Sequence, residues 1–261
     1  MAFSVCCSGL SEMPRPVIIL GLGYTTKRLA RRLQESGRTV HAATGHPPNP
    51  EGLPHGAVLV HSIPPVEEPD RSAIRNFIHS VEPDRILYIS STGVYGAQTN
   101  VDETTTAAPD DGKGRARLVE EEWLTATGAP VLIFRSAAIY GPGRGIHMRL
   151  RNGSLTGLPR GAGGVVSRIH VDDLAALLAA GIDAGLTGAW PVADERPAAS
   201  SEVIRWHAAK LGIDLPEIPG ELSVPQRGRF VNGRKILELL GVKLKYPSWE
   251  TGIPASEEET D

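Results

Sequence analysis

The stretch from Val17 to Leu33 constrains the fold more than any other part of the chain. Its first four residues, Val17 to Leu20, are all apolar, which predicts a β-strand buried on both faces. Two glycines, Gly21 and Gly23, then permit a tight turn and let a ligand approach the backbone. Apolar residues at helical spacing follow, and Gly37 stands where such a helix would end. A strand, a glycine turn and a helix in this order predict a site for the diphosphate of a dinucleotide at the helix N-terminus.

The turn lacks the third glycine of the usual G-x-G-x-x-G motif, because Thr26 stands in its place. That glycine normally allows close packing between the helix and the strand, and threonine brings a β-branched side chain into the same space. An ordinary βα turn without a ligand is therefore the alternative interpretation. The residues of the turn that we expect to contact a cofactor are Gly21, Leu22, Gly23, Tyr24, Thr25 and Thr26.

Further apolar runs predict the remaining strands of a parallel sheet, with helical patterns between most of them. The runs span residues 39–43, 57–63, 85–89, 130–135 and 190–193. The connection from 44 to 57 carries four prolines, which disfavours a helix there. We therefore expect an α/β fold, a doubly wound parallel sheet, from which one helix–strand unit at an edge is missing.

Ligands of such sheets bind beyond the carboxyl ends of the strands. The further cofactor contacts expected there are Thr44, Gly45, His46, Ile63, Pro64, Pro65, Ser90, Ser136 and Ile139. An acidic residue after the second strand would hold the ribose 2′-OH of NAD, and an arginine would accept the 2′-phosphate of NADP. Neither stands in the segment from Thr44 to Pro48, so the choice between NAD and NADP stays open. We expect no metal.

Four motifs, in an order and spacing that cover the chain from Pro16 to about Gly252, make the chain similar to a known family. They are residues 21–23 (Gly-Leu-Gly), 90–96 (Ser-Ser-Thr-Gly-Val-Tyr-Gly), 139–144 (Ile-Tyr-Gly-Pro-Gly-Arg) and 168–174 (Arg-Ile-His-Val-Asp-Asp-Leu). Through them the chain resembles the extended short-chain dehydrogenase/reductase superfamily, and within it the atypical NAD-dependent epimerase/dehydratase-like proteins. The resemblance implies a doubly wound, NAD(P)-binding Rossmann domain and a small C-terminal α/β substrate lobe.

The chain is expected to divide along these lines. Residues 1–13 would be a flexible N-terminal tail, with Met13 as an alternative start of the chain. Residues 14–143, with 168–194 returning to them, would form the Rossmann domain, and 144–167 together with 195–253 the substrate lobe. Residues 254–261 are acidic and lack apolar anchors, which predicts a disordered tail.

The resemblance also implies a catalytic serine or threonine and a Tyr-x-x-x-Lys pair at the start of a helix. In such enzymes the tyrosine exchanges a proton with the substrate and the lysine holds the cofactor ribose. Ser91, four residues before Tyr95, falls on the serine position, whereas the aligned helix has Lys113 and Arg117 in place of the pair. Lys113 could donate a proton only if burial or Arg117 favoured its neutral form, and Arg117 can hold a ribose or phosphate but cannot give up its proton. A solvated helix face is the alternative for both residues.

Tyr95 and Tyr140 are the phenols nearest the expected site. Tyr95 is kept as a candidate catalytic residue, although we expect both to fill space beside their glycines. His170 is expected to begin a helix, satisfied by the backbone. Some members of a basic cluster are expected to converge on the cleft, where they would suit an anionic substrate: Arg144, His147, Arg149, Arg151, Arg160, Arg168, Arg227, Arg229, Arg234 and Lys235.

Two functions follow. The first is an NAD(P)-dependent oxidoreductase or nucleotide-sugar epimerase/dehydratase-like enzyme, with a small-molecule substrate that is anionic or a nucleotide sugar. The second is a dinucleotide-binding sensor or partner-binding protein without hydride chemistry. The net charge of −3 and the lack of a long apolar run give no reason to expect nucleic acid or a membrane as partners. The two cysteines are adjacent, so they cannot build a disulfide framework, which fits a reducing cytoplasm. A homodimer is compatible with the resemblance.

Overall fold

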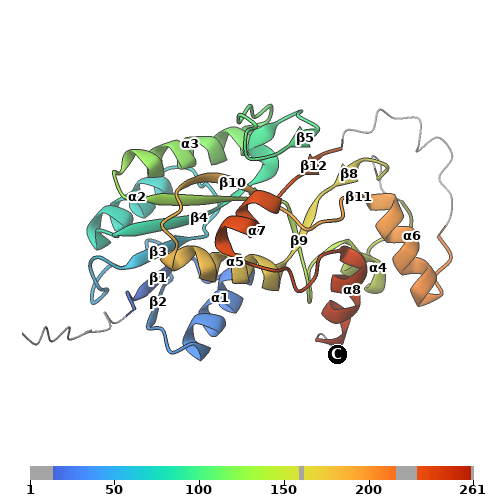
Figure 1. Ribbon diagram of the computed structural model, residues 1–261, viewed down its shortest axis with the longest axis horizontal. Helices are drawn as coiled ribbons and strands as arrows, with labels where there is room; N and C mark the ends of the chain where they lie inside the picture. The colour runs from blue at the N-terminus through green and yellow to red at the C-terminus, as the bar shows by residue number, and fades with distance from the viewer. Residues whose placement is uncertain (1–13, 159–161, 216–227, 260–261) are drawn as a thin grey trace, which may run out of the picture.

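The computed structural model describes residues 14–158, 162–215 and 228–259, and its centre is a six-stranded parallel sheet (Figure 1). Across the sheet the strands follow the order β10-β6-β4-β3-β1-β2, and every neighbouring pair is parallel. The strands are β1 (Val17–Leu20), β2 (Val40–Ala43), β3 (Val58–His61), β4 (Arg85–Ser91), β6 (Val131–Ser136) and β10 (Gly188–Val192). The expected doubly wound sheet is confirmed.

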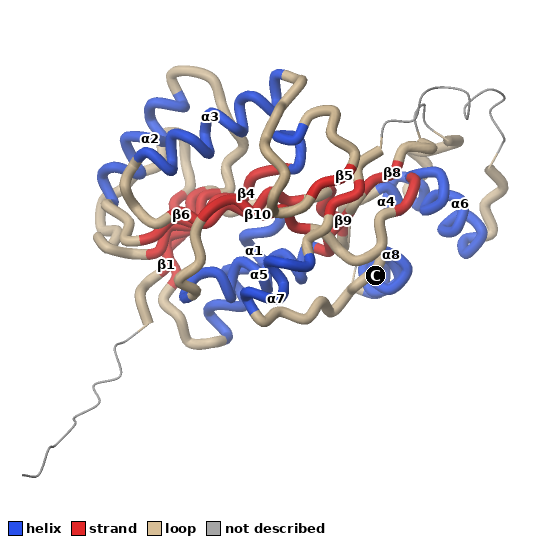
Figure 2. Tube along the Cα trace, turned by 45° about the horizontal axis from the view of Figure 1, so that its top comes forward, coloured by secondary structure: helices blue, strands red, loops and turns tan. Residues whose placement is uncertain are grey.

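Helices cover both faces of this sheet, as Figure 2 shows. On one face lie α1 (Tyr24–Glu35), α5 (Val171–Asp183) and α7 (Arg234–Leu240), and on the other α2 (Asp70–Val81) and α3 (Gly112–Ala126). Alternate residues of each strand enter different cores: Val17 and Ile19 pack with α1 and α5, whereas Ile18 packs with α2. All four residues of β1 are fully buried, which explains its unbroken apolar run.

The sheet ends at β2, as the prolines after it predicted. The segment from Thr44 to Ala57 contains no helix, and the chain passes from β2 directly to β3 on the other side of β1. In the usual order of this fold another helix and strand lie between the two. The expectation of a missing edge unit is therefore confirmed.

The remaining elements lie around the carboxyl ends of the strands and beyond them. They comprise the 3₁₀-helix η1 (Thr92–Tyr95), helices α4 (Ile146–Arg151), α6 (Ser200–Leu211) and α8 (Trp249–Glu258), and short strands β5 (Asn100–Val101), β7 (Ala138–Tyr140), β8 (Val165–Val166), β9 (Arg168–His170), β11 (Ala198–Ala199) and β12 (Phe230–Val231). Helices α4, α6 and α8 gather at one end of the molecule (Figure 1). No helix within the described ranges is both long and apolar enough to cross a membrane.

Two expectations about the C-terminal part are wrong. Residues 254–258 are helical in α8 rather than disordered, because Ile253 and Ser256 face the core and the Ser256 hydroxyl lies 3.1 Å from Nε2 of His170. Residues 195–253 do not all join the lobe, because Ile236 of α7 packs into the core between α5 and the sheet. The expected N-terminal tail lies outside the described residues.

Candidate functional site

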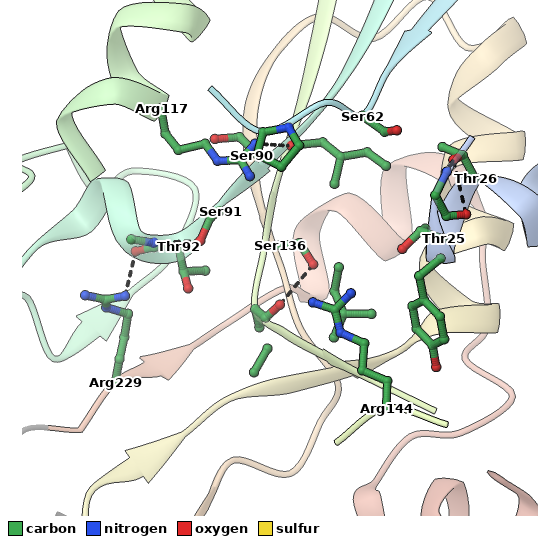
Figure 3. Close-up of a pocket in the computed structure, with 18 residues that line it drawn as sticks. Thr25, Thr26, Ser62, Ser90, Ser91, Thr92, Arg117, Ser136, Arg144 and Arg229 are labelled. Atoms are coloured by element: carbon green, nitrogen blue, oxygen red, sulfur yellow. Dashed lines mark hydrogen bonds between the residues drawn. The ribbon is translucent and has the colours of Figure 1, made fainter. Parts of the chain in front are cut away.

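A cavity of about 630 Å³ opens at the carboxyl ends of the central strands (Figure 3). Its lining combines the first turn of α1, the ends of β4 and β6, and side chains from three later segments. The lining residues are Gly23, Tyr24, Thr25, Thr26, Ser62, Pro64, Ile89, Ser90, Ser91, Thr92, Gly93, Arg117, Ser136, Ala137, Ala138, Ile139, Arg144 and Arg229. We call this space the main cavity.

The two glycines of the turn serve different purposes. Gly21 has a φ of +91°, and a Cβ there would lie 2.8 Å from Cγ1 of Ile63 and 2.9 Å from Oγ of Ser62, so only glycine fits. A Cβ on Gly23 would meet nothing within 4 Å. The space in front of Gly23 is thus open, and it lies at the N-terminus of α1, where backbone N–H groups and the helix dipole favour an anion.

Thr26 replaces the third glycine without closing this space. Its Oγ1 donates to the carbonyl of Gly21 at 2.7 Å and accepts the N–H of Gly23 at 2.8 Å. The side chain is fully buried, and its hydroxyl links Gly21 and Gly23 within the turn. The missing glycine is therefore compensated by hydrogen bonds from a hydroxyl rather than by close packing.

Exchanging Thr26 for valine is expected to lower the free energy of unfolding by about 1–3 kcal/mol, because two partly buried hydrogen bonds of about 0.5–1.5 kcal/mol each are lost. Thr26→Ser keeps the hydroxyl and should retain most of this stability. Chemical denaturation of both variants measures the difference. Equal stabilities of the valine and serine variants would show that the hydroxyl does not hold the turn.

The two serines at the end of β4 have opposite hydrogen-bonding states. Ser91 caps η1, and its Oγ accepts the N–H of Gly93 at 3.2 Å, so its proton remains available to a ligand. The hydroxyl of Ser90 donates to Oε1 of Glu121 at 2.5 Å, so it offers only its lone pairs. One hydroxyl of the main cavity is thus a potential donor, and its neighbour is an acceptor.

Glu121, which holds Ser90, belongs to a buried ion pair. Its carboxylate accepts from Nη2 of Arg135 at 2.7 Å and from Nε at 3.1 Å. Glu121 is 2% exposed and Arg135 9%. The strong hydrogen bonds and the neighbouring carboxylate raise the pKa of Arg135 against the effect of burial, so the guanidinium stays charged.

Three arginines line the main cavity, and two of them are held by the protein itself. Arg117 donates through Nη1 to the carbonyl of Ile89 at 2.9 Å and to Oη of Tyr88 at 3.0 Å. Arg229 donates to the carbonyls of Thr92 (2.6 Å), Gln98 (3.2 Å) and Gly96. The guanidinium of Arg144 has no hydrogen-bond or ion-pair partner within the part of the chain that the structure describes, and its nearest described contact is the ring of Tyr24.

The main cavity brings together about half of the residues expected from the sequence. Those that line it are Gly23, Tyr24, Thr25, Thr26, Pro64, Ser90, Ser91, Arg117, Ser136 and Ile139. Those outside its lining are Gly21, Leu22, Thr44, Gly45, His46, Ile63, Pro65, Tyr95 and Lys113. Pro65 and the exposed Lys113 line a neighbouring hollow of about 1050 Å³, which shares Ser91 and Arg117 with the main cavity.

The tyrosines do not supply a replacement for the missing phenol. Tyr95 is 1% exposed in a separate core cluster, and burial raises its pKa. Tyr140 donates to the carbonyl of Ser248 at 3.2 Å, and burial raises its pKa as well. Tyr24 lines the main cavity, but its hydroxyl donates to the carbonyl of Pro142 at 3.0 Å and burial raises its pKa to about 12. The structural role expected for Tyr140 agrees with its burial.

The basic cluster converges only in part. Of its members within the described ranges, Arg144 and Arg229 line the main cavity, whereas Arg168 is buried and donates to the carbonyls of Val166 and Ala198. Arg160 and Arg227 lie outside the described residues. His170 caps α5 by accepting the N–H of Asp172 at its Nδ1, so it is a structural residue as expected.

Sequence reasoning missed several lining residues: Ser62, Ile89, Thr92, Gly93, Ala137 and Ala138. Ser62 follows β3, and its hydroxyl donates to the carbonyl of Gly21 at 2.6 Å. Ser62 follows a predicted buried strand, and this position in the sequence could have identified it as a lining residue. Within the described residues, no cluster of three or more His, Cys, Asp or Glu could hold a metal ion.

Comparison with known proteins supports this architecture. No protein-family model matches the chain. Over 166 residues, 56% of the chain, it is 30% identical to a Streptomyces protein described as a 3-diazoavenalumate denitrifying reductase, and the match covers 54% of that protein, about half its length.

Solved structures match over nearly the whole chain, and two of them illustrate the likeness. A functionally unknown conserved protein from Silicibacter pomeroyi is 30% identical with a TM-score of 0.75, and the match covers 94% of this chain and 99% of that one. The Bordetella bronchiseptica enzyme WbmG, solved in complex with NAD and UDP, is 17% identical with a TM-score of 0.73, and 94% of each chain is covered. The second likeness is one of fold.

Proposed function

We propose that the chain is an NAD(P)-dependent oxidoreductase of the extended short-chain dehydrogenase/reductase type. Its fold, which resembles that of proteins described as NAD-dependent epimerases, and its partial sequence match to a reductase support this proposal. The observation that carries the proposal is the continuity of the main cavity. It joins the open space before Gly23, at the N-terminus of α1, to the hydroxyls of Ser90 and Ser91 at the end of β4. Its volume also suits a small-molecule site.

The residues present fit a dinucleotide. The open turn at Gly23 and the first N–H groups of α1 would hold the diphosphate. Ser136 and Ile139, at the end of β6 and in β7, would line the nicotinamide half together with Ser90. When bound, the nicotinamide ring supplies or accepts a hydride. The residues directly after β2 expose Thr44, Gly45 and His46, and Thr44 to Pro48 include neither an acid nor an arginine, so both NAD and NADP fit this proposal.

Ser91 and Arg117 would bind the substrate oxygen at which proton transfer occurs. Ser91 can donate its hydroxyl proton in a hydrogen bond to a substrate oxygen, because its Oγ already accepts the N–H of Gly93. Arg117 adds a fixed positive charge beside the same end of β4. Neither group has the acidity of the family's Tyr-x-x-x-Lys pair, so a substrate that takes its proton from solvent suits this site best.

For the substrate we propose a small anionic molecule or a nucleotide sugar. The curated relative from Streptomyces is named a reductase, which favours reduction over sugar epimerisation. The three arginine side chains of the lining favour a substrate with a carboxylate or phosphate group. Lys113 remains a candidate contact through the neighbouring hollow rather than the main cavity.

The test is a binding titration of NADH and NADPH, followed by turnover assays over a panel of nucleotide sugars and small carboxylates. We expect binding of at least one cofactor, and turnover that falls about 100-fold in Ser91→Ala, the magnitude typical for loss of one hydrogen-bond donor to developing charge. Ser80→Ala is the matched control, because Ser80 is an exposed serine on α2 that lines neither the main cavity nor the neighbouring hollow. Full activity of Ser91→Ala would contradict the role given to Ser91, and no binding of either cofactor would end the proposal.

A dinucleotide-binding sensor without hydride chemistry is the second candidate. One observation favours it. Among the described residues, Tyr24 is the one tyrosine that lines the main cavity, and its hydroxyl already donates to the carbonyl of Pro142. Cofactor binding without turnover on the whole panel would support the sensor.

A further inference from the structure

We propose that Arg144 binds the diphosphate of the dinucleotide cofactor and is held in position for this by the ring of Tyr24. The inference rests on the proposed function and adds a residue to it. Arg144 lies in the loop between β7 and α4, far from the glycine turn in sequence, and its side chain lines the main cavity (Figure 3).

The first argument is the contrast among the three arginines of the main cavity. Arg117 is held through its Nη1 group and Arg229 through Nε, Nη1 and Nη2, which donate to carbonyl and hydroxyl oxygens of the protein. Arg144 has no such partner within the described ranges, and it is exposed. A guanidinium carries five N–H donors in a planar fork that matches a phosphate, so Arg144 is the one of the three that keeps its whole fork for an anion.

The second argument is its location. The guanidinium carbon of Arg144 lies 5.2 Å from the centroid of the Tyr24 ring, and Tyr24 is the first residue of α1. The guanidinium of Arg144 therefore lies near the N-terminus of α1 and the open space before Gly23. Both the helix dipole and the guanidinium attract an anion at this place.

The third argument is that the loop is built to keep Arg144 at this place. The hydroxyl of Tyr24 donates to the carbonyl of Pro142 at 3.0 Å, and Gly141 and Arg144 exchange two backbone hydrogen bonds of 2.9 and 3.0 Å. A Cβ on Gly141 would lie 2.7 Å from the Tyr24 hydroxyl, so glycine allows the approach. The neutral phenol ring offers its face to the cation without competing as an anion.

The experiment measures dissociation constants by fluorescence titration or calorimetry for wild type and Arg144→Ala. We expect Arg144→Ala to weaken NADH and ADP-ribose about 10- to 100-fold, the loss typical of charge-assisted hydrogen bonds, and to leave adenosine, which has no phosphate, unchanged. Arg144→Lys should recover only part of the affinity, because it lacks the fork and the flat face. Arg149→Ala, on α4, changes the net charge equally at an exposed residue outside the main cavity and should bind as wild type.

The ring is tested by Tyr24→Leu alone and combined with Arg144→Ala. If Tyr24 acts by holding Arg144, the two losses of NADH affinity are not additive. Additive losses would show that the ring acts independently of the guanidinium.

Each remaining result has a distinct meaning. Unchanged NADH and ADP-ribose affinity in Arg144→Ala, with wild type binding normally, would overturn this inference and leave the proposed function standing. Weaker binding of UDP-glucose with unchanged NADH would assign Arg144 to a substrate diphosphate and overturn it as well. No NADH binding by wild type would end the proposed function itself.

Discussion

Exchanging Glu121 for glutamine is expected to lower the free energy of unfolding by about 3–5 kcal/mol, the range for removing one partner of a buried ion pair. The carboxylate takes two N–H groups of Arg135 and the hydroxyl of Ser90, and all three residues are less than a tenth exposed. Glutamine leaves the charge of Arg135 buried without compensation. Chemical denaturation followed by circular dichroism measures the loss.

The adjacent residue provides the control. Glu122→Gln removes the same charge from an exposed position of α3, so a change of less than about 0.5 kcal/mol is expected. A loss below about 1 kcal/mol for Glu121→Gln would mean that Arg135 is compensated in another way. In that case Glu121 would also not be the group that fixes the Ser90 hydroxyl.

Exchanging Gly23 for valine is expected to weaken NADH binding by more than about 100-fold while costing less than about 1 kcal/mol of stability. A Cβ at this position meets nothing within 4 Å of the protein and the φ of −98° suits any residue, so the folded chain accepts the side chain. The valine would occupy the space in which we place the diphosphate. Fluorescence titration and thermal melting of the same preparation separate the two effects.

Gly21→Ala is the matched comparison. Its Cβ would collide with Ile63 and Ser62 at a φ of +91°, so this variant should lose stability as well as affinity. Wild-type affinity in a folded Gly23→Val protein would show that the diphosphate does not bind at this turn.

The parts of the fold that the sequence predicts are those with a local cause. The buried strands from Val17 and from Arg85 have continuous apolar runs, and the prolines after residue 46 correctly predict the missing edge unit. The serines of β4 were found because they directly follow such a run.

The contacts that the sequence could not predict are made by residues far apart in the chain. Arg229 donates to the carbonyl of Thr92, 137 residues earlier. Arg144 contacts the ring of Tyr24 because the loop after β7 brings it there. The end of the chain was wrongly expected to be disordered for the same reason: its acidic composition does not reveal that Ser256 packs against His170. Nor does composition reveal that the hydroxyl of Thr26 compensates for a glycine.

The shortened sheet has a consequence for its edge strand β2. No further strand lies beside β2 in the part of the chain that the structure describes, so its outer edge carries backbone groups without a strand partner, the kind of edge onto which a strand from another molecule can add. The chain leaves β2 through Pro47, Pro48, Pro50 and Pro54, none of which has an N–H to donate. The four-residue length of β2 and the prolines that follow it thus limit how far a strand from another molecule could pair along this edge.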